Sequence, residues 1–341
     1  MAPFKSSLAR TVGKLLGVSK NTDLSLRGDA QAIRSLPVQS SGGTKSTYND
    51  KTIHAFTSTG PSTLEISGGP GSYSIEYIVV AGGGGGGRHN GGGGGGAGGY
   101  RTGTATVTGP VSVTVGAGGA GKEPSNAPND LANPGSNSSI TGPGSLSITS
   151  TGGGGGGNSD TPSLSDANGR PGGSGGGAGS LSTDSGQPGA GNTPPVSPPQ
   201  GRSGGGTAGS DNANYREGAG GGGKGGTGGS AVLSNNPYRG GHGGLGVQAP
   251  STFRDPNTPY GAPGPNSEGF WFSGGGGGGS YANPGSGYAK GGSGPGGGGP
   301  YAGGANGGDN NATANTGGGG GGADRNGAGD GGSGIVLIAI G

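Results

Sequence analysis

Five runs of glycine, each six residues long, constrain the fold of this chain more than any other feature. They lie at 82–87, 91–96, 152–157, 274–279 and 317–322, with shorter glycine-rich pieces between them. A linker selected only for flexibility has no reason to return to one length, whereas rods packed side by side do. The repeated length therefore predicts a bundle of matched segments.

Glycine runs of this kind are suited to the polyproline-II conformation, which makes one turn every three residues and rises about 3.1 Å per residue. Six residues then make two turns, about 19 Å long. Because glycine has no Cβ atom, such helices can pack backbone to backbone and donate their N–H groups to neighbouring carbonyls. The strict Gly-X-Y period of collagen is absent. We predict a layered bundle of polyglycine-II helices within residues 82–330.

An ordinary hydrophobic core is excluded by composition. Of 341 residues, 101 are Gly and 25 are Pro, and only 25% are hydrophobic. A disordered linker or coat is the alternative, but the high net charge typical of disorder is missing, since the formal charge is +2. That charge gives no reason to expect nucleic acid or an anionic membrane as a partner. With no cysteine, neither disulfides nor thiolate metal sites can hold the chain together.

Short β-branched segments flank the glycine runs and predict strands. The last of them, 334–340, is too apolar for an exposed tail, and we expect it to pair with 75–80. It is also the longest apolar run and is far shorter than the ~20 residues of a membrane helix, so no membrane insertion is expected. The fold class predicted is all-β with polyglycine-II helices, in which early strands and the C-terminal strand form a small β-sandwich enclosing the bundle. The predicted strands are 53–56, 63–66, 74–80, 104–107, 111–115, 145–149 and 334–340.

The chain divides into five parts by composition. Residues 1–36 are basic and contain an apolar pattern at spacings of three and four, which predicts one short N-terminal helix. We interpret this part as a docking peptide that orders against a partner protein, the alternative being a frayed basic tail. Its candidate docking residues are Phe4, Leu8, Arg10, Val12, Leu15, Leu16, Leu24, Leu26 and Arg27. The remaining four parts of the chain are a linker (37–51), a β-strand region with the first glycine runs (52–150), a polyglycine-II region with variable loops (151–330) and a closing strand (331–341).

Several motifs imitate catalytic or cofactor sites without their context. Residues 78–87 imitate a dinucleotide-binding turn, but Arg88-His89-Asn90 and more glycines follow where a helix is needed. The histidines His54, His89 and His242 are isolated from other ligands in sequence. A Gly-Ser-Gly at 285–287 has no strand–helix setting, and one Arg-Gly-Gly at 239–241 is no RNA-binding array. We expect no enzyme activity, no cofactor and no metal.

Side-chain diversity collects in the connections between glycine segments. The richest connection, 252–272, holds the only Trp and three of the five Phe. Loops rich in Tyr, Trp and Arg on a rigid scaffold are typical of binding surfaces. Aromatic rings also stack on sugars, so a surface glycan is one expected ligand, although the aromatic cluster 270–272 could instead be a small satellite core. The candidate receptor contacts are Tyr215, Arg216, Tyr238, Arg239, Phe253, Arg254, Tyr260, Phe270, Trp271, Phe272, Tyr281, Tyr288 and Tyr301.

An ordered set of segments resembles the glycine-rich domain of phage structural proteins. The set comprises 75–82, Ala97-Gly98-Gly99-Tyr100-Arg101-Thr102-Gly103, 113–121 and 331–338, so the resemblance covers about residues 52–341. The segments 4–10 and 23–28 are similar to the N-termini of virion proteins from marine phages. The glycine segments further resemble the polyglycine sandwich of tail-fibre-tip adhesins, whose distal loops contact the host receptor.

That resemblance implies a virion localisation, other virion proteins as the partners of residues 1–36, and a host-recognition role for the loops. The first hypothesis is a fibre or adhesin subunit, homotrimeric as fibres typically are, that binds a host glycan or outer-membrane protein. The second is a capsid, neck or tail decoration or joining protein without a receptor. The third is a glycine-rich extracellular coat or ice-binding protein, although the loops lack the regular Thr or Ala arrays that ice binding would favour.

Overall fold

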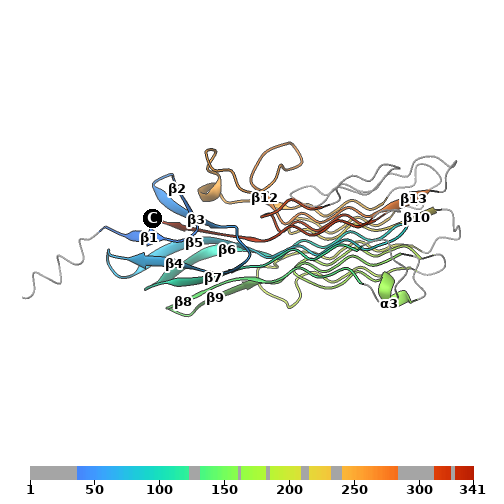
Figure 1. The fold of residues 1–341 in the computed structure, drawn as a ribbon, viewed down its shortest axis with the longest axis horizontal. Helices are drawn as coiled ribbons and strands as arrows, with labels where there is room; N and C mark the ends of the chain where they lie inside the picture. The colour runs from blue at the N-terminus through green and yellow to red at the C-terminus, as the bar shows by residue number, and fades with distance from the viewer. Residues whose placement is uncertain are drawn as a thin grey trace, which may run out of the picture.

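The structure of the protein is a computed structural model, which describes residues 37–122, 131–159, 163–181, 185–208, 215–231, 240–282, 311–323 and 327–341. The predicted N-terminal helix and all nine candidate docking residues, Phe4 to Arg27, lie outside these residues. The described chain forms a β-sandwich from which a long bundle of glycine rods extends in one direction (Figure 1).

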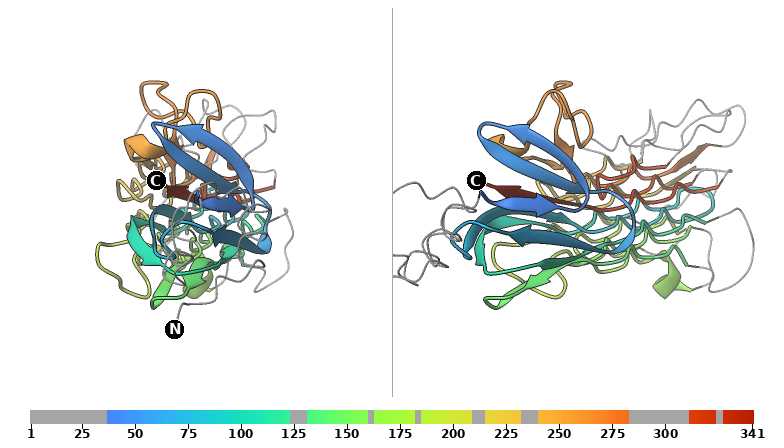
Figure 2. Two further views of the ribbon diagram at one scale, coloured as in Figure 1. Left: turned by 90° about the vertical axis from the view of Figure 1, so that its left-hand side faces the viewer. Right: turned by 60° about the vertical axis from the view of Figure 1, so that its left-hand side comes forward.

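Two five-stranded antiparallel sheets make the sandwich. In each sheet, strands from distant parts of the chain lie side by side, as Figures 1 and 2 show. The first sheet has the order β1 (Gln39–Ser41), β4 (Gly60–Ser67), β7 (Val111–Val115), β8 (Ser138–Gly142) and β9 (Leu146–Ser150). The second has the order β2 (Thr44–Tyr48), β3 (Lys51–Phe56), β14 (Ile335–Ile340), β5 (Tyr73–Val80) and β6 (Tyr100–Val107).

The core between the sheets follows the alternation of apolar residues along the strands. In β7, Val111, Val113 and Val115 are buried while the residues between them are exposed. β14 differs, because all six of its residues are buried. It is the central strand of the second sheet, with one face in the sandwich core and the other in a second apolar cluster. A continuous apolar strand is expected where both faces of a sheet are covered.

The predicted strands are confirmed, including the pairing of the C-terminal strand with 75–80, in which Ile335 lies opposite Val80 and Ile340 opposite Ile75. The prediction of a linker at 37–51 is wrong, because β1, β2 and the start of β3 lie there. These polar strands lie at the edges of the two sheets and are largely exposed, so they lack the apolar alternation that marks a half-buried strand. The strand β8 was also missed.

The glycine runs form rods whose hydrogen bonds repeat every three residues. Within 82–87, residues one turn apart donate to the same neighbouring segment, and adjacent residues donate to different ones. This is the pattern of a helix with three residues per turn. The N–H groups of Gly82 and Gly85 donate to Ser136 and Asn133, those of Gly83 and Gly86 to Gly332 and Gly329, and those of Gly84 and Gly87 to Gly96 and Gly93.

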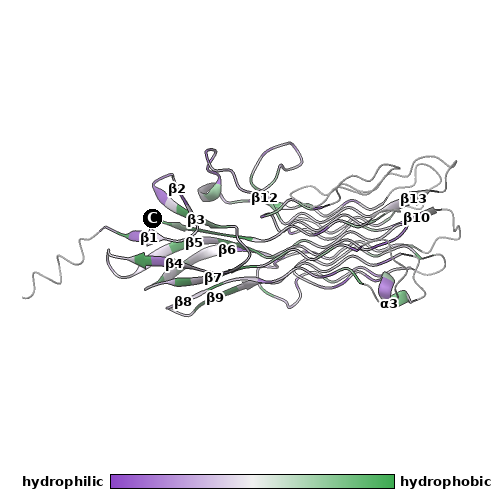
Figure 3. Cartoon of the chain, viewed as in Figure 1, coloured by the Kyte–Doolittle hydropathy of each residue, from purple (hydrophilic) through white to green (hydrophobic). Residues whose placement is uncertain are grey.

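Each rod in the interior is surrounded by others. The run 82–87 donates to three segments and its carbonyls accept from three more, at Gly119, 153–156 and 320–323. A Cβ atom on Gly84 would lie 2.2 Å from the carbonyl oxygen of Gly154. The same conflict recurs along the run, so only glycine fits. In the bundle, backbone hydrogen bonds therefore replace the packing of apolar side chains. Figure 3 shows that the hydrophobic residues are concentrated in the sandwich rather than in the rods.

Candidate functional site

The fold has two distinct ends. Residue 37 leads directly into β1, and β14 ends at the same end of the molecule, in the sandwich (Figure 1). The far end of the bundle carries the turn 88–90, the helix α3 (Leu164–Ala167) and a short antiparallel pair of β10 (Tyr215–Glu217) with β13 (Ser280–Ala282). The rods thus hold two sets of connections far apart, and only the far-end set lies away from residue 37 and from the end of β14.

Three candidate contact residues meet at the far end. In the β10–β13 pair, Arg216 lies opposite Tyr281, and Tyr215 precedes Arg216 on β10. Arg216 is partly exposed. The neighbouring turn is anchored to the rods, because the N–H of Arg88 donates to Asn158 Oδ1 (3.1 Å) and the Arg88 carbonyl accepts from the N–H of Ser159 (3.1 Å). A fixed, side-chain-bearing edge is what a recognition surface requires.

A buried carboxyl group in this pair was not anticipated from the sequence. Glu217 is fully buried, and in the part of the chain that the structure describes neither of its carboxylate oxygens has a hydrogen-bond partner. Burial raises the pKa of Glu217 to about 8. A single Glu among loop residues gives no periodic signal of burial, so sequence reasoning had no means of finding it.

The aromatic connection packs against the second sheet of the sandwich, at the end of the molecule away from β10 and β13 (Figures 1 and 2). β11 (Val247–Gln248) precedes the connection, the 3-10 turn η1 (Ser251–Phe253) lies at its start, and β12 (Trp271–Phe272) lies at its end. Phe253 and Phe272 are 3% and 0% exposed, and they pack on β14 and β3 in the second apolar cluster. Phe270 and Tyr260 are partly buried against the same cluster. Phe270 and Phe272 thus belong to a small satellite core, whereas Trp271 is not part of that cluster. The interpretation of Phe253 and Phe272 as receptor contacts is wrong, because burial removes both side chains from the surface.

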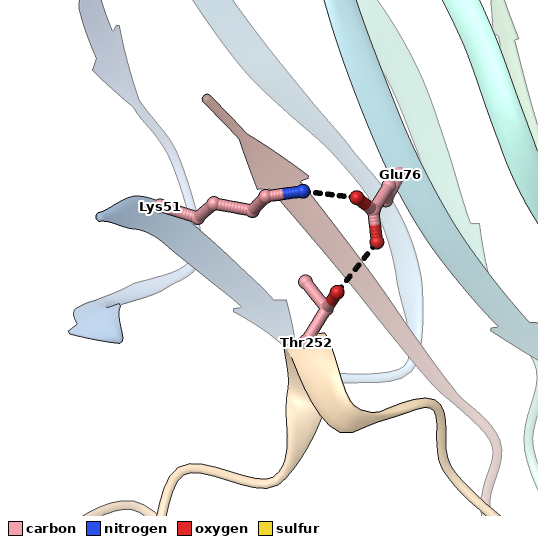
Figure 4. Close-up of polar contacts among 3 residues, drawn as sticks. All are labelled: Lys51, Glu76 and Thr252. Atoms are coloured by element: carbon pink, nitrogen blue, oxygen red, sulfur yellow. Dashed lines mark hydrogen bonds and ion pairs between the residues drawn. The ribbon is translucent and has the colours of Figure 1, made fainter. Parts of the chain in front are cut away.

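A three-residue polar contact fastens this connection to the sheet. Glu76 on β5 accepts from Thr252 Oγ1 (2.7 Å) through one carboxylate oxygen and pairs with Lys51 on β3 through the other (Figure 4). Both hydrogen bonds lower the pKa of Glu76, and the one from Lys51 has the larger effect. Arg254 follows within the connection and donates from Nε to the carbonyl of Ala249 (2.6 Å). Its role here is to shape the loop.

Trp271 is partly exposed and covered on one side by its own loop. Gly264 lies so close that a Cβ atom there would be 2.2 Å from the indole Nε1. The next residue back along the chain, Phe270, has a positive φ of 68°, an uncommon conformation for a bulky residue. The Trp271 side chain therefore packs within this compact loop, and only part of its surface is exposed to solvent.

In the described part of the chain, no group of three or more His, Cys, Asp or Glu residues could hold a metal ion. In the same residues, no helix is long and apolar enough to cross a membrane.

A family model of the glycine-rich domain matches residues 57–341. The chain belongs to this family. The matched region of the glycine-rich domain begins just after β3 and includes both the rods and the closing strand β14. A search of curated proteins gave no match.

The glycine-rich domain separates the predicted contact residues into two groups. Tyr215, Arg216 and Tyr281 lie together at the far end, whereas the residues from Phe253 to Phe272 lie against the sandwich. Four further candidates, Tyr238, Arg239, Tyr288 and Tyr301, lie outside the described residues. The sequence predicted which residues occupy connections but not which end of the bundle each connection occupies.

Proposed function

We propose that this glycine-rich domain protein is a structural protein of a phage particle, a fibre or adhesin subunit that attaches through the sandwich end and offers the far end to the host surface. The observation that carries the proposal is the polarity of the fold, with residue 37 and the C-terminus at one end and the Arg216–Tyr281 connections at the other. A docking segment at 1–36 would enter the molecule at the sandwich end, leaving the far end free for a host glycan or outer-membrane protein.

The bundle suits this role because it holds the far-end connections in fixed positions without a conventional hydrophobic core. In the described rods, backbone hydrogen bonds hold the residues from which the connections start, as in the run 82–87. Loops on such a scaffold can vary without changing the fold. The sandwich end, in contrast, uses its aromatic side chains for internal packing, which favours the far end as the recognition surface.

Adsorption of purified protein to host cells tests the proposal. We expect the parent to bind cells and to block infection, and Arg216→Ala with His89→Ala at the far end to reduce adsorption at least about tenfold, the loss of roughly 1.4 kcal/mol. Ser147→Ala, on the exposed face of β9 at the sandwich end, is the matched control and should bind as the parent does. Protein that decorates particles but ignores cells would support the joining-protein alternative instead.

Attachment is tested separately by removing residues 1–36. The remaining chain contains both sheets and all described rods, so it should fold and give the circular dichroism of the parent. We expect it to fail to enter particles. Normal incorporation of the shortened protein would contradict attachment through this segment.

A further inference from the structure

The β10–β13 pair contains an unusual concentration of buried oxygen atoms without partners. Glu217 and Ser280 lie directly opposite each other, so their side chains share one face of the two-stranded pair. Ser280 is 3% exposed, and within the described residues neither its hydroxyl nor either Glu217 carboxylate oxygen has a hydrogen-bond partner. Native proteins pair nearly all buried polar side chains, so these atoms require an explanation.

Among the described residues, no neighbouring charge compensates the carboxyl group. The turn that carries Arg88 and His89 lies against β10, because a Cβ atom on Gly91 would be 2.8 Å from the backbone of Arg216. The rod that carries His242 is bonded next to β10, where the Gly241 N–H donates to Gly218. Arg216 itself alternates to the other face of the strand. None of these groups perturbs Glu217, whose shifted pKa has burial as its cause.

We infer that the β10–β13 pair is a proton-controlled latch, closed while Glu217 is protonated and opened when Glu217 ionises. A buried, unpaired carboxylate must either take up a proton or move into water. Moving into water requires only that a pairing of three residues on each strand opens, whereas the rods behind it are held by many hydrogen bonds. The latch joins the ends of the rods 217–223 and 273–280, beginning with the bond from the Gly218 N–H to Gly279 (2.8 Å).

The direction of the pH dependence follows from the two protonation equilibria. In the open state Glu217 titrates near its ordinary value of 4.5, and in the closed state its pKa is about 8. Below about pH 4.5 both states are protonated, and the latch is at its strongest. Between these two values only the open state loses its proton, which stabilises it. The equilibrium constant for opening therefore rises about tenfold per pH unit, and it becomes constant above about pH 8.

Hydrogen exchange of the amides of β10, β13 and Gly218 in the full chain tests the latch. After correction for intrinsic exchange rates, we expect their protection factors to fall about 100-fold between about pH 5.5 and about pH 7.5. Glu217→Gln, which stays neutral, should hold protection constant over this range. Glu268→Gln, an exchange of a carboxyl in the aromatic connection, should leave the parent's pH dependence unchanged.

Two results would overturn the inference. One is protection in the parent that does not change with pH, or that changes equally in Glu217→Gln. The other is restoration of protection at about pH 7.5 by calcium chloride only when Glu217 is present, which would make the carboxylate a cation ligand. Neither measurement depends on host binding, so the latch and the proposed adhesin function can fail independently.

Discussion

At the residue scale, the fold depends on the absence of side chains. The Cβ position of a rod glycine points at a neighbouring carbonyl, as at Gly83, where an added Cβ would lie 1.9 Å from the Gly318 oxygen. Real Cβ atoms do not approach oxygen so closely. Each such glycine is therefore a packing requirement, and the usual entropic cost of fixing glycine is offset by the hydrogen bonds that close packing allows.

Replacement of one interior glycine tests this requirement. Gly84→Ala should lower the free energy of unfolding by about 1–3 kcal/mol or more, because the methyl group must displace the Gly154 backbone. The control is Gly269→Ala, since nothing lies within 4 Å of a Cβ atom there, and it should change stability by less than about 0.5 kcal/mol. Urea unfolding measures both, and equal effects of the two substitutions would contradict close rod packing.

His54 on β3 links the two sheets through hydrogen bonds of its imidazole ring. Its Nδ1 is 2.7 Å from the Gly42 carbonyl and its Nε2 is 2.8 Å from Ser40 Oγ, so the neutral ring donates to the first and accepts from the second. Burial lowers the pKa of His54. Because the folded pKa lies below the unfolded value of 6.5, stability is retained above about pH 6.5 and is lost as pH falls through the folded pKa.

Urea unfolding at a series of pH values below about 6.5 checks this. The parent should lose stability with acidification, and His54→Gln should show a smaller loss over that range even if it is less stable overall. His242→Gln, on an exposed part of a rod, is the control and should retain the parent's slope. A slope unaffected by His54→Gln would assign the acid sensitivity to other groups.

At the scale of elements, the sandwich and the rods obey different sequence rules. The alternation in β7 and the continuous apolar run of β14 were sufficient to predict strands, because burial of side chains selects them. Rods were predicted from length and the lack of Cβ atoms. The edge strands β1 and β2 could not be predicted, because exposed polar residues such as Ser40 and Thr47 are selected for pairing and solubility rather than for a core.

The aromatic connection is a separate element whose attachment can be weakened. Thr252→Val removes the hydroxyl that donates to Glu76 and nearly preserves volume, so it should destabilise the docked loop by about 1 kcal/mol. Fluorescence of Trp271, the only tryptophan in the chain, should report greater exposure to acrylamide quenching. Thr141→Val, on the exposed face of β8, should leave quenching unchanged, and equal quenching in both variants would show that the Glu76 contact does not hold the loop.

At the scale of the whole molecule, the sequence does not indicate which connections lie at which end of the bundle. Each connection is followed by glycine whichever end it occupies, so the chain offers no local sign that separates Arg216 from Trp271. Their assignment to opposite ends depends on the number of rods crossed between them, including short ones such as 226–231 that no six-residue run marks. The contact set was therefore predicted by residue type, and only its far-end members support the proposed function.

The central claim is that the glycine runs are ordered, hydrogen-bonded rods, and amide exchange in the full-length protein tests it most directly. Each N–H of 82–87 donates to a backbone carbonyl at 2.8–3.0 Å, so these amides should exchange as slowly as those of the central strand β14, and more slowly than the exposed Gly269. Exchange of the 82–87 amides at the rate of an unstructured glycine peptide would contradict the account.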